Sequence, residues 1–171
     1  MSESREPVRE LLKKAYVRLL CRKPYTDITI TDLTAEAGVS RVSYYRAFNS
    51  FEDIINEIST DIYERMSKDF LPLLLGNSEK YVKAMISGFF VRLKESNIKN
   101  FPQENIRFAF SVFSKKLKLE SSTSSGIRQK YSPIINVSIL LAVARKWALS
   151  GFEESEEELS DFVYSAIAAL R

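Results

Sequence analysis

Apolar side chains recur at steps of three and four residues along most of the chain, and this spacing places them on one stripe of a helix. These stripes predict longer helices over residues 8–20, 51–70, 81–93, 102–119, 133–151 and 155–170. The one short alternation typical of a strand, Ile28 and Ile30 around Thr29, runs directly into a helix start. The pattern therefore predicts an all-α chain.

Polar residues and glycines mark where these helices begin and end. Thr29 and Asp32 have capping-box spacing, which predicts a short helix that ends at Gly38. Ser40 is placed as the N-cap of a second short helix over 41–48. Farther along, the pair Ser132–Pro133 predicts a helix that begins at residue 133.

Two short helices joined by Gly38, Val39 and Ser40 form the arrangement of a helix-turn-helix motif. In that motif the second helix enters the major groove of DNA and the first braces it. Tyr44 and Phe48 lie four residues apart, so we expect them to face inward from the second helix. The same spacing leaves Arg41, Val42, Ser43, Tyr45 and Arg46 at its start or on its other faces.

The stretch from Thr29 to Phe48, with its continuation to Ile55, resembles the N-terminal domain of the TetR family of transcriptional regulators. The resemblance covers about residues 8–58 and is weaker beyond, where Trp147, Gly151 and 155–159 are similar to the last two helices of many members. It implies a DNA-binding domain over 1–50 and a helical effector-binding and dimerisation domain over 51–171. It also implies a homodimer on a palindromic operator, and in most members repression until a small molecule binds.

The resemblance assigns roles to individual residues. Thr29 matches a phosphate contact, the residues from Arg41 to Ser43 match the positions that read base edges, and Tyr45 matches an aromatic contact to the DNA backbone. Ser40 caps the second helix and is expected to face a phosphate as well. The predicted DNA-binding residues are Thr29, Ser40, Arg41, Val42, Ser43, Tyr45 and Arg46.

Three positions depart from the pattern of the family. Val42 stands where glycine is common, which favours an apolar contact with a thymine methyl group. Ala47 stands where histidine is frequent. Phe51 replaces the usual lysine, and losing one phosphate contact lowers the salt dependence of binding by about one unit.

Aromatic residues of the second half have two interpretations. Effector pockets are mostly apolar, but aromatics at helical spacing usually form a core. The predicted effector pocket consists of Phe89, Phe108, Phe113 and Trp147. The segment 134–149 is apolar on nearly all sides and needs cover all round, which, with the resemblance, predicts a dimer interface. That predicted interface consists of Ile139, Val143, Trp147, Phe162 and Val163.

Composition excludes several other classes of protein. The chain has no histidine, one cysteine and five glycines, so we expect neither an enzyme, nor a metal site, nor a bound cofactor. The alternative function is a helical protein-interaction or sensor module that has lost strong DNA binding, and Ala47 and Phe51 keep it open.

The net charge of +3 is unevenly distributed. Residues 1–50 hold 9 basic and 6 acidic side chains, residues 51–150 hold 15 and 10, and residues 151–171 hold 1 and 6. A basic body of this kind is consistent with double-stranded DNA as a partner. The N-terminus lacks an apolar signal core, and 134–149 is too short to span a bilayer, so we expect no membrane association and a cytoplasmic location.

Overall fold

The computed structural model describes residues 7–74, 79–116 and 126–169, and within these ranges every regular element is a helix. The prediction of an all-α chain is thereby confirmed. The longer helices are α1 (Val8–Leu20), α2 (Ile30–Ala37), α3 (Arg41–Ala47), α4 (Phe51–Leu74), α5 (Glu79–Glu95), α6 (Gln103–Lys116), α7 (Ile127–Leu149) and α8 (Glu156–Ala168). Two short 3-10 helices, η1 (Tyr25–Asp27) and η2 (Asn97–Asn100), precede α2 and α6.

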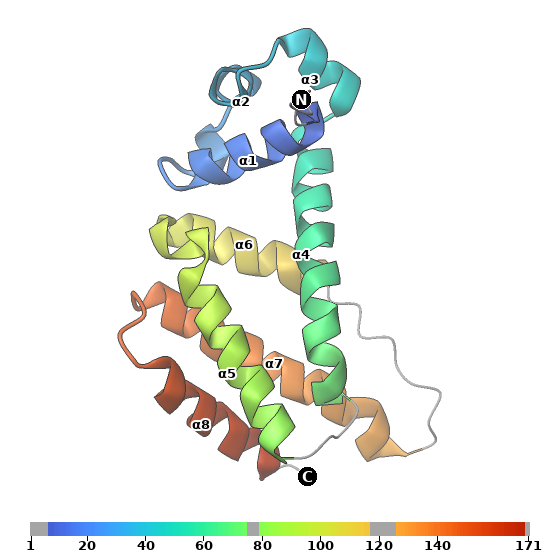
Figure 1. Cartoon of the computed structure of the whole chain (residues 1–171), viewed down its shortest axis with the longest axis vertical. Helices are drawn as coiled ribbons and strands as arrows, with labels where there is room; N and C mark the ends of the chain where they lie inside the picture. The colour runs from blue at the N-terminus through green and yellow to red at the C-terminus, as the bar shows by residue number, and fades with distance from the viewer. Residues whose placement is uncertain (1–6, 75–78, 117–125, 170–171) are drawn as a thin grey trace, which may run out of the picture.

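The helices form two groups that α4 joins along one side of the molecule (Figure 1). The first group, α1 to α3, lies at one end and is called here the helix-turn-helix unit. The second group, α5 to α8, forms the core unit at the other end. Helix α6 lies across the top of the core unit, facing α1.

The helix-turn-helix unit has a small apolar core of its own. Each of the first four helices contributes a large side chain that is 0% exposed: Leu12 of α1, Leu33 of α2, Tyr44 of α3 and Ile54 of α4. The cap predictions are confirmed here: the Thr29 hydroxyl accepts a hydrogen bond from the Asp32 N–H. Burying these side chains is what holds such short helices in place, because helices of seven or eight residues are marginal alone.

The core unit is built around aromatic rings. Phe90 and Trp147 meet edge to face at 5.4 Å between centroids, and Phe152 meets Trp147 in the same way at 4.7 Å. Aliphatic side chains from α5, α7 and α8, including Ile86, Leu140 and Ile167, are fully buried around them. A capping box of Ser155 and Glu158 starts α8, close to the predicted helix start at residue 155.

Two helix ends differ from the prediction. Helix α7 begins at Ile127, so the predicted start at Pro133 is wrong. A proline has no N–H to donate, but a helix of 23 residues can lose one backbone hydrogen bond and continue. Helix α4 likewise continues past Pro72 to Leu74. The serine-rich run 121–126, whose composition predicts a flexible loop, lies outside the described residues except for Gly126.

Helix α4 belongs to both units. Phe51, Ile54, Ile55 and Ile58 in its first turns pack on the first core, and its later turns contact α5, α6 and α7. The predicted domain boundary at 50/51 therefore coincides with the start of a shared helix. Within the described ranges, no helix combines the length and the apolar character that a bilayer crossing requires.

Candidate DNA-binding site

The turn between α2 and α3 depends on Gly38. Its backbone is left-handed, with φ of 66°, a conformation that glycine adopts without strain. A Cβ atom there would meet nothing within 4 Å, so the conformation rather than crowding selects glycine. The next residue, Val39, returns its N–H to the Thr34 carbonyl at 3.0 Å, which closes the turn.

Helix α3 divides its side chains as the spacing predicts. Tyr44 and Phe48 are 0% and 2% exposed and pack into the first core. Val42 and Tyr45 are 60% and 58% exposed and point away from that core. An outward apolar side chain and an outward aromatic ring on a short helix form a surface suited to contact another molecule.

The polar groups of the site hold one another in place. Ser40 caps α3 by accepting the Ser43 N–H at 3.0 Å, and the two hydroxyls lie 2.9 Å apart. The Arg41 guanidinium donates to the hydroxyl of Thr31 on α2. Of the seven predicted DNA-binding residues, Ser43 is half-buried and the other six are exposed: Thr29, Ser40, Arg41, Val42, Tyr45 and Arg46. The seven predicted residues therefore lie on or next to α3, with only Thr29 at the start of α2.

Sequence reasoning did not find Arg9, which secures the far end of α3. Its guanidinium lies 4.3 Å from the centre of the Phe48 ring, donates to the Ala47 carbonyl and pairs with Glu57 on α4. One side chain of α1 thus holds the C-terminus of α3 against α4. Arg9 and Ala47 are 38 residues apart in the sequence, so no local pattern could indicate this contact.

Most of the basic charge of the helix-turn-helix unit is already paired. Lys13 contacts Glu10 and Asp61, each at 2.6 Å. Arg18 and Arg22 both bind Glu36, at 2.6 and 2.7 Å. Among the described residues, Arg41 and Arg46 have no acidic partner, so they carry the free positive charge on α3.

These contacts shift several ionisation equilibria. The hydrogen bond from Lys23 lowers the pKa of Asp32, and the Thr29 hydroxyl and N–H lower it further. The pKa of Glu36 is lowered by its hydrogen bonds from Arg18 and Arg22. Both carboxylates therefore stay ionised to a lower pH than they ordinarily would, which favours their ion pairs with the end of α1 and the residues just after it.

The structure explains two of the three departures from the family pattern. Phe51 belongs to an aromatic cluster, with its ring 6.1 Å from that of Tyr16 and 6.3 Å from that of Tyr44. It therefore serves packing where a lysine would reach outward. Ala47 is half-buried and packs against the same core, beneath the Arg9 guanidinium.

Comparison with solved structures gives matches that cover nearly the whole chain. The fatty acid degradation regulator FadR from Bacillus halodurans has a TM-score of 0.70 and 14% identity, over 96% of each chain. A TetR transcriptional regulator from Streptococcus agalactiae has a TM-score of 0.57 and 19% identity, over 94% of this chain and 93% of that one. The fold is that of TetR-type regulators.

A third similar structure is the dihydroxyacetone kinase operon activator DhaS, with a TM-score of 0.56 and 18% identity over 95% of this chain and 94% of that one. By sequence, no family model matches the chain, and no curated protein is significantly similar to it. The likeness to TetR-type regulators is therefore a likeness of fold.

Within this TetR-like fold, the four predicted pocket residues do not form one site. Phe89 and Trp147 are 6% and 1% exposed and lie in the core of the second unit. Phe113 is half-buried against that core. Phe108 instead faces the helix-turn-helix unit, where its ring stacks on Tyr25 at 3.9 Å and an angle of 7°.

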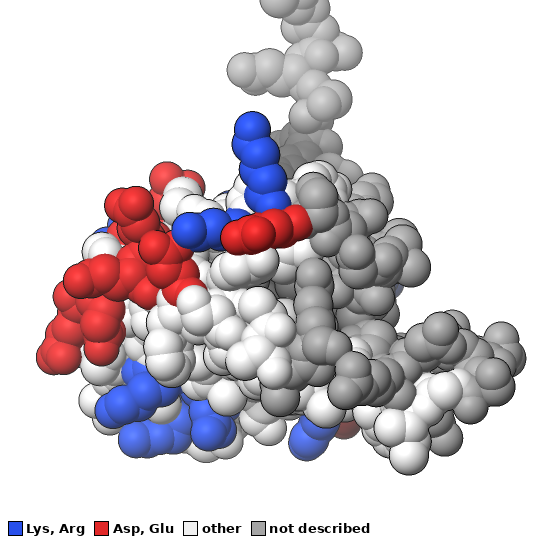
Figure 2. All heavy atoms as spheres, turned by 90° about the horizontal axis from the view of Figure 1, so that it is seen from below, with Lys and Arg blue, Asp and Glu red and all other residues white. Residues whose placement is uncertain are grey.

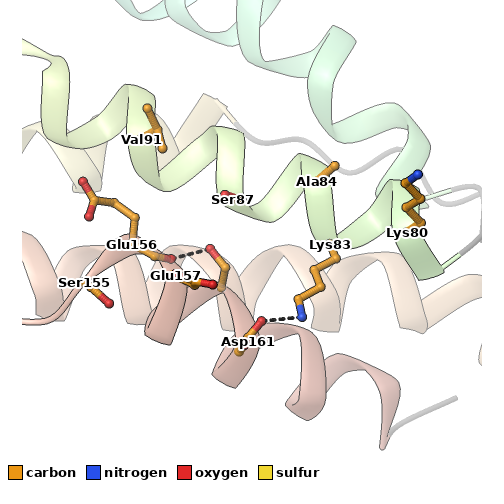
Figure 3. Close-up of a pocket in the computed structure, with 10 residues that line it drawn as sticks. Lys80, Lys83, Ala84, Ser87, Val91, Ser155, Glu156, Glu157 and Asp161 are labelled. Carbon is orange, nitrogen blue, oxygen red and sulfur yellow. Dashed lines mark hydrogen bonds and ion pairs between the residues drawn. The ribbon is translucent and has the colours of Figure 1, made fainter.

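A groove of about 590 Å³ runs between α5 and α8, and Figure 3 shows the side chains that line it. Its walls carry charged and polar side chains together with Ala84 and Val91, and Lys83 of α5 is paired to Asp161 of α8 at 2.6 Å. None of the four predicted pocket residues lines it. Sequence reasoning missed this groove because it depends on how two distant helices approach each other.

The predicted dimer residues divide into outward and inward groups. Phe162 is 63% exposed, whereas Trp147 and Val163 are 1% and 0% exposed inside the chain's own core. The two buried residues leave almost no surface for a second copy, and Ile139 and Val143 are half-buried. Ile135 and Tyr131, also on α7, are more exposed, at 42% and 46%. Figure 2 shows the end of the molecule away from the helix-turn-helix unit, with acidic side chains gathered at one side. The first turn of α8 carries Glu156, Glu157 and Glu158.

Proposed function

We propose that this chain is a sequence-specific DNA-binding transcriptional regulator whose α3 reads the major groove. The observation that carries the proposal is the outward face of α3, where Val42 and Tyr45 are 60% and 58% exposed beside Arg41 and Arg46. Arginine suits paired acceptors on guanine, and valine suits the methyl group of thymine. Tyr45 and Thr29 are proposed to contact phosphates, which fix the register of the helix on the duplex.

The proposed affinity for DNA is modest. Salt-dependent binding scales with the number of phosphates that basic side chains neutralise. Lys13, Arg18, Arg22 and Lys23 are held by acidic partners in the structure, and Phe51 has no charge. Few basic side chains are left for phosphates, so the gradient of log K against log salt is expected to be shallow.

The proposed active form is a homodimer on a palindromic operator. The outward side chains of α7 and α8, above all Phe162, supply an apolar surface that a second copy would cover. A two-fold dimer places its recognition helices on half-sites about 34–36 Å apart or a multiple of that distance. A Phe162→Glu variant should sediment as a monomer, while Val91→Glu on α5 should leave the dimer intact.

A small-molecule effector is proposed to bind the core unit and to release the operator, which makes the chain a repressor. The aromatic core around Trp147 and the groove between α5 and α8 are the two candidate places. Trp147 is the only tryptophan of the sequence and lies in the aromatic core, so its fluorescence distinguishes them. An effector that enters the core should change that emission strongly, whereas one bound in the groove should leave it nearly unchanged.

Selection of duplex DNA from a random pool by the full-length chain tests the proposed function. We expect an enriched palindrome whose binding weakens with salt. Arg41→Ala should cost about 1–3 kcal/mol on that sequence and relax the preference at one base pair of each half-site. Lys80→Ala on α5 removes the same charge far from α3 and should have no such effect. If no sequence is enriched even at low salt, the proposal fails.

The second candidate is a helical interaction or sensor module without strong DNA binding. The extensive pairing of basic residues on α1 and just after it is the observation that favours this candidate. This candidate predicts that the full-length chain shows no salt-dependent affinity for any duplex, yet recovers a specific protein partner through the outward face of α3. Loss of that partner with Tyr45→Ala would support it.

A further inference from the structure

The helix-turn-helix unit and the core unit are joined at a second place besides α4. On α6, the side chain of Asn105 is 0% exposed, although α6 belongs to the core unit. Its amide nitrogen donates to the carbonyls of Leu20 and Lys23, and its amide oxygen accepts the N–H of Tyr25, all at 2.8 Å. A core-unit side chain thus satisfies three backbone groups at the end of α1 and the start of η1.

Aromatic contacts extend this junction along α6. Phe108, one turn beyond Asn105, stacks its ring on Tyr25 at 3.9 Å. Phe101, just before α6, packs against the buried cores of both units. We call Asn105, Phe108 and Tyr25 the α6 latch.

The latch differs from an ordinary buried polar contact in its specificity. An asparagine amide has two N–H donors and an oxygen acceptor, and here both kinds of group are used. Shifting α6 relative to α1 by an ångström would break all three bonds together and leave buried backbone groups unpaired. The arrangement therefore favours one relative position of the two units.

Because the helix-turn-helix unit is attached to the core unit both through α4 and through the α6 latch, the angle between the two units is fixed. Helix α4 is continuous through both units. If α4 alone joined them, a bend in α4 would tilt the helix-turn-helix unit relative to the core unit. The latch joins the units on the side away from α4, between α1 and α6 (Figure 1). With both in place, the orientation of α3 relative to the core unit is set.

We propose that Asn105, supported by the stack of Phe108 on Tyr25, is a positioning residue for DNA binding: it sets the angle of the helix-turn-helix unit and thereby the separation of the two recognition helices in a dimer. This inference rests on the proposed function. In a dimer the core units define the two-fold axis, so a rotation of each helix-turn-helix unit changes the distance between its α3 and the partner's. The half-site spacing that the dimer accepts is a direct readout of that distance.

The experiment compares operators built from the selected half-site with spacers of varied length. The full-length wild-type chain should prefer one spacer sharply. Asn105→Ala and Phe108→Ala should flatten this preference, and their affinity for the preferred operator should fall about tenfold if the competent orientation drops to a tenth of the population. Ser111→Ala, on an exposed position of α6, is the matched control and should bind as wild type does.

Binding to a single half-site separates positioning from stability. One half-site engages one helix-turn-helix unit, so the angle between units has no effect, and both variants should keep wild-type affinity for it. Phe108→Ala leaves no buried polar group unpaired, so it covers the case in which Asn105→Ala unfolds. Thermal melting confirms that each variant tested is folded.

The outcomes distinguish the two levels of the argument. If the wild-type chain enriches no DNA sequence, the proposed function fails. If it does, but both folded variants keep the wild-type spacer preference, or lose half-site affinity to the same extent as operator affinity, the positioning role of Asn105 is overturned.

Discussion

The helix-turn-helix unit and the core unit differ in which large side chains they bury and which they expose. In the helix-turn-helix unit a small core, tied at its edge by ion pairs, leaves Val42 and Tyr45 on the outside of α3. In the core unit the largest side chains, Trp147 and Phe90, are buried and meet edge to face. The difference indicates that the first unit is organised to present residues and the second to enclose them. Mutations should therefore separate stability from binding differently in the two units.

The largest effect is expected from the aromatic centre of the core unit. Trp147→Ala should lower the free energy of unfolding by about 3–5 kcal/mol, because it removes a fully buried ring and leaves a cavity. Val91→Ala, at a position 38% exposed, should cost about 0.5 kcal/mol. Urea unfolding followed by circular dichroism measures both. Equal costs would mean that the core is looser than the ring contacts indicate.

The two capping boxes provide a matched pair across the units. Thr29→Ala and Ser155→Ala each remove a hydroxyl that accepts an N–H at 3.2 Å, and each should cost about 0.5–2 kcal/mol. Only Thr29→Ala should also weaken DNA binding, since Thr29 caps α2 within the helix-turn-helix unit and is a proposed phosphate contact. Melting curves and DNA titrations on both variants test this. A comparable loss of DNA binding with Ser155→Ala would break the distinction between the units.

A smaller effect of opposite sign is expected at Tyr44. Its hydroxyl is buried and finds no hydrogen-bond partner among the described residues, and burial raises its pKa. Tyr44→Phe keeps the ring and removes the unsatisfied group, so it should stabilise the fold by up to about 1 kcal/mol. DNA affinity should not change, because the ring faces inward. Destabilisation in urea would show that the hydroxyl has a partner in solution.

The smallest expected effect concerns acid. The pKa of Asp32 lies below its ordinary value of 3.8 in the folded chain, so its ionised form stabilises the fold above that pH. This stabilisation is lost as the pH falls through the folded pKa. Asp32→Asn should therefore show a shallower fall in Tm below about pH 4 than wild type. Identical slopes would mean that the bonds from Lys23 and Thr29 do not persist in solution.

The sequence predicts the local structure of the helix-turn-helix unit better than it predicts the contacts between distant helices. The caps and the turn formed by Thr29, Gly38 and Ser40 depend on contacts with residues only three or four positions away. The local sequence is therefore enough to predict them. Asn105 bonds to residues 80 to 85 positions away, and its amide looks like any polar residue on a helix surface. No periodicity distinguishes it.

The same limit explains the misplaced features of the core unit. Ser132–Pro133 is a sound local signal, but packing along α7 outweighs one lost backbone bond. Phe108 has the spacing of a core residue and instead stacks against η1, because the position of α6 under α1 decides which face it turns inward. Local propensity gives way wherever long-range packing sets the geometry.

The sharing of α4 has a consequence for dissecting and recombining this protein. A fragment that stops at residue 50 would lack Ile54, which is fully buried in the first core, and Asp61, which pairs with Lys13. A helix-turn-helix unit that folds independently must therefore carry at least the first three turns of α4. Chimeras that exchange core units between proteins of this fold should therefore be joined inside α4, beyond Asp61. Each helix-turn-helix unit then keeps the part of α4 that completes its own core.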